Sequence, residues 1–176
     1  AALYWSAMGD VLRRVVSLFV APNEAWEEIA SEPASVDRLT GRYIVPLALL
    51  APAATVVGML NFDASWDPAH GYLVPADAIW SAGVTTLFAS IASIFVLAGI
   101  FVAIAPMYGS SRDYASALKV ATYGAVPVLV AGALLVLPVM VMVSVVALCY
   151  TLYLYWIGVR RVLAVPEDSR TEFIGI

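Results

Sequence analysis

One group of residues in the chain has the types and spacing of a metal site. Asp63, Asp67 and His70 stand at positions i, i+4 and i+7, which would share one face of a helix. Carboxylates and imidazole are common ligands of divalent metal ions. Pro68 opposes a regular helix in this segment. We therefore interpret the segment as a solvated acidic loop, expect no metal site, and keep these three residues as a weak alternative.

Other residues that often do chemistry are scarce. One His and one Cys exclude a disulfide framework and any Cys/His zinc cluster supplied by this chain alone. Cys149 lies in a run of apolar residues, where a thiol stays protonated and inert. The sequence contains no G-x-S-x-G, P-loop or H-E-x-x-H motif. We therefore expect no enzyme activity, no catalytic residues and no cofactor.

Small and hydroxylated residues form two neighbouring rows at four-residue spacing in the stretch 78–106. The rows are Ser81, Thr85, Ala89 and Ser93, and Ala78, Ala82, Thr86 and Ser90. Small residues at this spacing let membrane helices approach closely, and hydroxyls can bond across the contact. We favour packing inside a helix bundle. A contact between copies of the chain and the lining of a solute path are the alternatives.

The composition of the chain is unusually apolar. Of 176 residues, 62% are hydrophobic and 12% are charged, whereas a soluble domain has about 25% charged residues. The mean hydropathy is +0.91. The net charge of −4 offers no basic excess for nucleic acid. We therefore expect an integral membrane protein whose surroundings are the lipid bilayer.

Charged residues divide the chain into apolar stretches that fit membrane-spanning helices. A bilayer core about 30 Å thick takes roughly 20 helical residues. The pattern predicts an all-α transmembrane bundle over residues 43–163. Its four spans are expected near residues 44–60, 78–106, 120–137 and 139–157. Pro138 cannot continue a helix, so we place the turn between the last two spans there.

All nine Lys and Arg residues fall on one side of this four-span arrangement. They precede the first span, lie between the second and third, or follow the fourth. The loop at residues 61–77 holds three Asp and no cation. By the positive-inside rule, the basic side faces the cytoplasm. We therefore predict a cytoplasmic N-terminus.

An amphipathic segment precedes the first span. Apolar residues between positions 11 and 19 recur at helical spacing, opposite Arg13 and Arg14. Because the segment is too short to cross the membrane, we predict an interfacial helix with both arginines near the head groups. A helix packed on the ends of the bundle is the alternative. Pro22 ends this helix, and a second short helix carries Trp26, which we also place at the interface.

The parts outside the bundle complete the predicted domain organisation. Residues 1–7 precede the first Met and are interpreted as a tag or linker remnant. Residues 8–42 are expected to form the cytoplasmic amphipathic helices and a linker. Residues 164–176 are expected to form a cytoplasmic tail or the lead-in to a further span.

Three segments resemble the Yip (Ypt/Rab-interacting protein) domain family. They are residues 18–26 with Pro22, residues 109–127 with Tyr123 and Pro127, and residues 150–168 with Tyr153 and Gly158. The resemblance implies five spans, the fifth following residues 166–168. The short N-terminal region is similar to that of prokaryotic members, which implies a bacterial inner membrane. The GTPase partnership of eukaryotic relatives is therefore not carried over, and the resemblance brings no catalytic residues.

These observations leave two hypotheses for the function. The first is a non-enzymatic membrane scaffold or adaptor with an unidentified protein partner. It rests on the resemblance, the amphipathic helix and predicted spans free of the ionisable residues that mark ion pathways. The alternative is a small-solute or ion transporter or channel, which rests on the hydroxyl rows and on prolines within the spans. We also expect a homo-oligomer, because a small bundle buries one small-residue row and leaves the other for a second copy.

Overall fold

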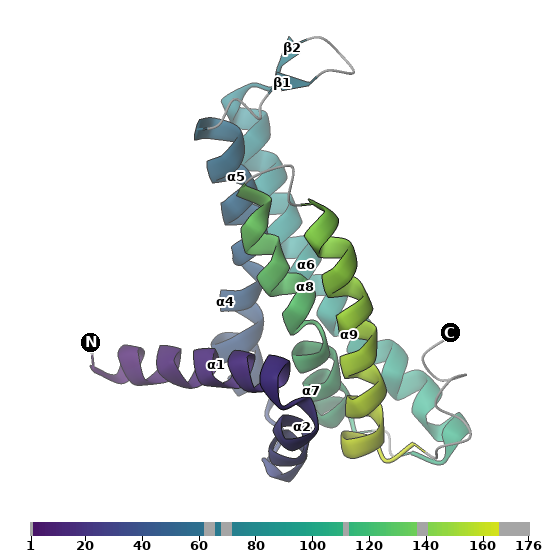
Figure 1. Ribbon diagram of the computed structural model, residues 1–176. Coiled ribbons are helices and arrows are strands. Elements are labelled where there is room, and N and C mark those ends of the chain that lie inside the picture. The colour runs from purple at the N-terminus through teal and green to yellow at the C-terminus, as the bar shows by residue number, and fades with distance from the viewer. Residues whose placement is uncertain (1, 62–65, 68–71, 111–112, 137–140, 166–176) are drawn as a thin grey trace.

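The computed structural model describes residues 2–61, 66–67, 72–110, 113–136 and 141–165. Long helices lie side by side along one axis, and an N-terminal helix crosses that axis at one end (Figure 1). We call this end the base. A small hairpin stands at the opposite end (Figure 1). The predicted class, an all-α transmembrane helix bundle, is confirmed for the described residues.

The first span is one helical segment, Val36–Asn61, made of four pieces. They are α3 (Val36–Leu39), the π-helical η1 (Thr40–Ile44), α4 (Val45–Ala48) and α5 (Leu50–Asn61). Pro46 and Pro52 interrupt the hydrogen-bond ladder because proline has no N–H to donate. The helix begins before the predicted residue 44 because Ser35 caps it, accepting the backbone N–H of Arg38.

The second span contains the longest helix of the described chain. α6 (Ala76–Ile104) continues into the 3-10 helix η2 (Ala105–Tyr108), and the two cover 33 residues. The predicted span, 78–106, differs from this segment by two residues at each end. The hairpin before it pairs the two-residue strands β1 (Trp66–Asp67) and β2 (Tyr72–Leu73) in antiparallel register.

The third span is bent, and the fourth is straight enough to be one helix. The third span begins with α7 (Tyr114–Gly124) and continues in α8 (Val126–Ala131) and η3 (Gly132–Val136). These pieces reach the length of a span only together, and a 41° bend separates α7 from the other two. Pro127 stands directly after the bend, where its missing N–H breaks the ladder. α9 (Val141–Val162) follows. The predicted turn at Pro138 lies outside the described residues.

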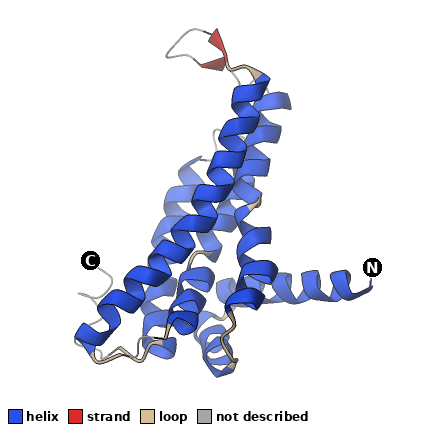
Figure 2. Ribbon diagram, turned by 180° about the vertical axis from the view of Figure 1, so that it is seen from behind, coloured by secondary structure: helices blue, strands red, loops and turns tan. Residues whose placement is uncertain are grey.

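Two N-terminal helices lie at the base, α1 (Ala2–Val20) and α2 (Pro22–Ser31). α1 extends away from the bundle, across the direction of the spans, in two opposite views (Figure 1, Figure 2). Residues 2–7, which we excluded from the fold as a tag or linker remnant, continue α1 as helix. Pro22 takes the first position of α2, where an N–H has no helical acceptor.

The core of the described chain includes the base, where α2, α7 and α9 pack together. Trp26, Leu18 and Leu118 are among its largest fully buried side chains. Further along the bundle, small residues let the first and third spans approach each other. A Cβ added at Gly132 would come within 2.5 Å of the Ala51 Cβ, so only glycine permits this contact.

Candidate functional site

Buried charges and aromatic rings meet at the base, between α1, α2, η1, α7 and α9. We call this group the base cluster. Its members are Arg14, Trp26, Glu28, Glu32, Tyr43, Lys119, Tyr123 and Gly158. They come from α1, from α2 and its C-cap, and from η1, α7 and α9, of which α7 and α9 lie far along the chain from the N-terminal helices. The cluster therefore joins the N-terminal helices to the spans.

Trp26 forms the apolar centre of the base cluster. Its side chain is fully buried and lies on the backbone of Gly158 in α9, where a Cβ would stand 2.5 Å from indole Cη2. The Trp26 and Tyr123 rings meet edge to face, with centroids 6.4 Å apart. The Tyr123 ring also packs edge to face against the ring of Tyr43 in η1, with centroids 5.0 Å apart. The three segments that resemble the Yip family thus converge on one contact.

Lys119 holds the end of α2. Its side chain is only 4% exposed, and Nζ donates to the backbone oxygens of Ile29, at 2.8 Å, and Glu32, at 2.6 Å. The last carbonyls of a helix have no partner within the helix and carry its negative dipole end. A buried ammonium from α7 therefore caps α2 at the point where the chain leaves it.

Arg14 connects α1 to the same region. Its guanidinium pairs with Glu32 and with Glu28, the Nη1 atom lying 2.8 Å from Glu28 Oε2. Burial acts to lower the pKa of Arg14, but the Glu32 and Glu28 carboxylates outweigh burial and raise it. Two further ion pairs reinforce the base, Arg42 with Asp10 and Arg161 with Glu27. The arginine charges at this junction are thus largely neutralised.

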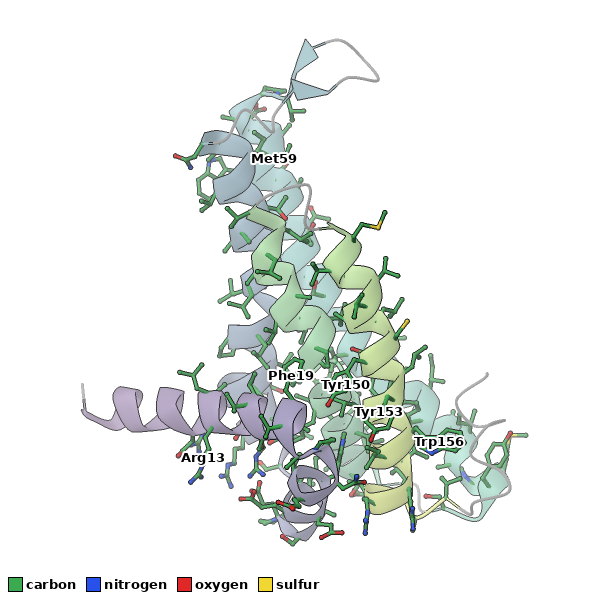
Figure 3. The ribbon with its side chains drawn as sticks, viewed as in Figure 1. Arg13, Phe19, Met59, Tyr150, Tyr153 and Trp156 are labelled. Atoms are coloured by element: carbon green, nitrogen blue, oxygen red, sulfur yellow. The ribbon has the colours of Figure 1, made fainter. Side chains whose placement is uncertain are left out.

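Tyr150 of α9 holds the last turn of α1. Its hydroxyl donates to the backbone oxygen of Leu18 at 2.8 Å, and its ring stacks on Phe19 with centroids 5.5 Å apart. Figure 3 shows Phe19 and Tyr150 beside each other where α1 meets α9. Tyr153, which we selected from the family resemblance, is partly exposed. Its ring centroid lies 5.6 Å from that of Tyr150. α1 therefore has a fixed direction relative to α9.

The structure corrects two of the three predicted membrane-interface residues. Arg14 and Trp26 are buried within the protein, whereas the Arg13 side chain is 77% exposed. Helical periodicity separates polar from apolar positions, but it does not reveal that Glu28 and Glu32 pair with Arg14. Nor does it reveal the space that Gly158 leaves for an indole.

The structure also corrects the favoured interpretation of the small-residue rows on α6. Exposed positions are Ser81, Ala82, Thr85, Thr86, Ala89 and Ser93, and Ser90 is half-buried. α6 instead packs through another face, which includes the buried Ile94, Ala98 and Phe101. The hydroxyls of Ser81 and Ser93 donate to backbone oxygens of α6 itself, so they need no neighbouring helix.

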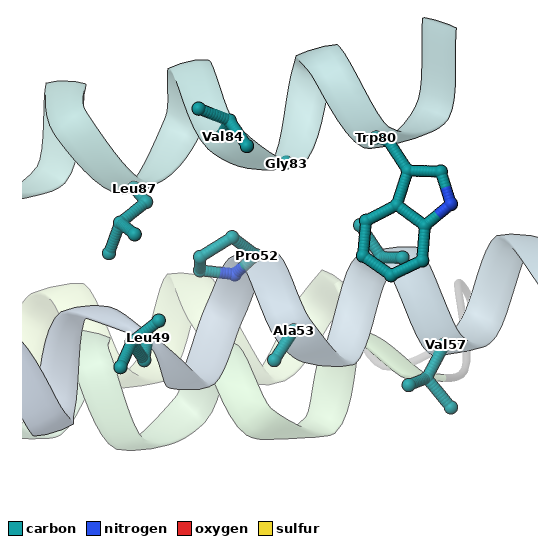
Figure 4. Close-up of a pocket in the computed structure, with 9 residues that line it drawn as sticks. Leu49, Pro52, Ala53, Val57, Trp80, Gly83, Val84 and Leu87 are labelled. Carbon is teal, nitrogen blue, oxygen red and sulfur yellow. The ribbon is translucent and has the colours of Figure 1, made fainter. Parts of the chain in front are cut away.

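An open groove of about 250 Å³ runs between α5 and α6 (Figure 4). Its lining consists of Leu49, Pro52, Ala53, Val56, Val57, Trp80, Gly83, Val84 and Leu87. None of these side chains is charged, and only the Trp80 indole has a polar atom. The groove thus presents an apolar surface without groups for acid–base or nucleophilic chemistry.

The metal alternative receives no support from the described residues. Within the described ranges, no three His, Cys, Asp or Glu side chains are grouped so that they could hold a metal ion. Asp63 and His70 lie outside these ranges, and the Asp67 side chain is not described. Cys149 is exposed on α9.

The helices form an all-α bundle with the length and apolar character of a membrane protein. In the described residues, three helices, or four counting the bent pair as one span, are long and apolar enough to cross a membrane. The family model of the Yip1 domain matches residues 16–176. The chain therefore belongs to the Yip1 domain family, as the sequence resemblance predicted. Comparison with curated proteins and with solved structures gives no match.

Proposed function

We propose that the protein is a non-enzymatic membrane scaffold or adaptor. The observation that carries this proposal is the attachment of α2 to the spans. Trp26 is anchored on Gly158, and Lys119 binds the end of α2. A helix held in this way keeps its solvent-facing side at a fixed position above the membrane. Such a platform suits the binding of a protein partner better than the turnover of a substrate.

The proposed orientation places the base in the cytoplasm, with the bacterial inner membrane as the location. Support comes from the positions of Arg13, Arg14, Arg42, Lys119 and Arg161, whose contacts or placement put them at the base. Lys and Arg concentrate on the cytoplasmic side of membrane proteins. Reporter fusions at Ser110 and at Ala76 test this orientation. We expect a cytoplasmic signal at Ser110 and an external one at Ala76, and the reverse pattern would contradict it.

A second candidate function follows from the outward-facing hydroxyls of α6. In a homo-oligomer built on α6, Thr85 and Thr86 of neighbouring copies could line a path for a small solute or ion. Their exposure in the single chain favours this alternative over a path through one protomer. Native mass spectrometry from mild detergent tests the oligomer. Ala89→Leu is expected to shift the mass toward the monomer, whereas Val145→Leu on exposed α9 leaves it unchanged.

Flux measurements distinguish the two functions. Purified protein is reconstituted in liposomes, and the uptake of a panel of ions and small solutes is compared with that of protein-free liposomes. The scaffold proposal expects equal uptake. Specific uptake that Thr86→Leu abolishes, and that Val145→Leu leaves intact, would establish the transporter instead. A strictly monomeric protein in detergents and nanodiscs would contradict the homo-oligomer.

A further inference from the structure

α1 carries an apolar face that is largely exposed in the described chain, where Phe19 stacks on Tyr150 of α9. We call Leu12, Val16, Phe19 and Val20 the α1 apolar face. Their exposed fractions are 59%, 56%, 45% and 79%. The residues recur at helical spacing and so lie along one side of α1. α1 attaches to the protein through a different side, which bears the buried Val11, Arg14 and Leu18.

The α1 apolar face is turned toward the part of the bundle that contains the spans. α1 crosses the bundle axis at the base (Figure 1). Phe19 lies on the side of α1 toward the bundle, and Arg13 lies on the opposite side (Figure 3). A membrane that surrounds the spans would therefore reach the α1 apolar face from the side of Phe19. The face adjoins α9, because Phe19 stacks on Tyr150 and Tyr150 lies beside the exposed Tyr153.

We propose that α1 lies in the plane of the membrane, with its apolar face among the acyl chains of the leaflet at the base. The occupant of this face is lipid, because it adjoins the surface that the spans present to the bilayer. A helix in this position gains free energy from each apolar side chain that it buries. Tyr150 and Arg14 fix its direction, so little conformational freedom is lost on insertion.

The contact is apolar rather than electrostatic. Arg14 is neutralised by Glu28 and Glu32, and Arg42 by Asp10. These groups have little charge left for anionic head groups. Arg13, which lies 3.7 Å from Asp10, is the remaining exposed cation in the described part of α1. Insertion should therefore depend weakly on anionic lipid and on salt, unlike that of a polybasic helix.

The test measures the depth of single labelled positions in nanodiscs that hold one copy of the chain. Cys149 is the only cysteine and is replaced by Ser. A spin label is then placed at Val16→Cys, or at Arg13→Cys as the matched control on the polar side. Both side chains are exposed, so the labels do not enter the core. Collisions with oxygen report the acyl region, and collisions with a water-soluble nickel chelate report the aqueous phase.

The proposal expects a label at position 16 to meet oxygen and to be protected from the nickel chelate. The label at position 13 should show the opposite pattern. Both results should hold in phosphatidylcholine alone and with added phosphatidylglycerol, and at low and high salt. Nickel access at position 16 in both lipids would overturn membrane insertion. Protection that requires anionic lipid and low salt would overturn the apolar mechanism.

Two further outcomes would assign the face to protein instead of lipid. Protection from both reagents would mean that a protein surface covers position 16. Disulfide formation between Val16→Cys chains in nanodiscs with two copies, and not between Arg13→Cys chains, would identify that surface as a second copy. The proposed insertion of α1 rests on the membrane location and not on the scaffold role. Solute flux in liposomes would therefore refute the scaffold role and leave the insertion of α1 intact.

Discussion

Trp26 lies against Gly158, and this contact joins a helix at the base to the fourth span. Three indole carbons approach within 2.9 Å of the position that a Cβ at Gly158 would occupy. The indole is fully buried there, and Tyr123 packs edge to face against it. The packing of Trp26 against α9 therefore requires that residue 158 have no Cβ.

Gly158→Ala should weaken this contact. The added Cβ would collide with a side chain that has no free space to move into, and such overpacking costs about 1–3 kcal/mol. Gly99→Ala is the control, because a Cβ there has nothing within 4 Å and alanine favours the helix by up to about 1 kcal/mol. Thermal unfolding in mild detergent measures both variants. Equal changes in Tm would contradict the close packing of Trp26.

Lys119→Met should detach the end of α2. The substitution removes two charge-assisted hydrogen bonds and leaves the Ile29 and Glu32 carbonyls without their donor, at a cost of about 2–3 kcal/mol. Hydrogen exchange of residues 22–31 should become faster. Arg13→Met, which removes an exposed cation 3.7 Å from its partner, should cost at most about 1 kcal/mol. Unchanged exchange in Lys119→Met would show that the cap is dispensable.

Tyr150→Phe should loosen α1. The variant keeps the ring stacked on Phe19 but loses the hydroxyl that donates to the Leu18 oxygen, which is worth about 1 kcal/mol. Amides in the last turn of α1 should exchange faster. Tyr153→Phe serves as the matched control, because its ring is partly exposed. Identical exchange in the two variants would rule out the hydroxyl as a tether.

Asp113 should stabilise α7 in a pH-dependent way. Its carboxylate accepts hydrogen bonds from the Ser116 hydroxyl and backbone N–H, the latter at 2.9 Å. The hydroxyl contact lowers the pKa of Asp113 below 3.8. A carboxyl group whose pKa is lowered by folding contributes stability at pH values above its pKa in the unfolded chain. This contribution is lost as the pH falls through its pKa in the folded protein. Asp113→Ala should cost about 1 kcal/mol at pH 7, and less below about pH 3.8.

Unfolding curves of Asp113→Ala at pH 7 and at pH 3 measure this difference against the unaltered chain. Asp113→Asn keeps a capping oxygen without the charge, so it should retain much of the stability at pH 7. A cost of Asp113→Ala that is the same at both pH values would contradict the role of the ionised carboxylate.

The spans could be predicted because charge and length limit them. The 33-residue helix from Ala76 to Tyr108 follows directly from an uncharged run too long for any loop. Pro127 could be recognised as a breaking point from its chemistry alone. These features depend on residues close together in the chain.

The base cluster could not be predicted in the same way, because its contacts join residues far apart in the sequence. Lys119 stands at the edge of an apolar run and resembles a cation that flanks a membrane span. Only its distance to Ile29, ninety positions earlier, reveals the cap. The outward direction of Thr85 and Thr86 likewise depends on which face of α6 meets the other spans. One clue was present, because Trp26, Tyr123 and Gly158 all belong to segments that resemble the Yip family.

The most direct test of the central claim is the spread of distances between α2 and α9. Spin labels at Glu24→Cys and Arg160→Cys, in a Cys149→Ser chain, report this separation by double electron–electron resonance in nanodiscs. Both positions are exposed. A fixed platform predicts one narrow distance distribution, which Lys119→Met broadens. A broad or multiple distribution in the otherwise unaltered chain would contradict the fixed attachment of α2 and, with it, the proposed scaffold.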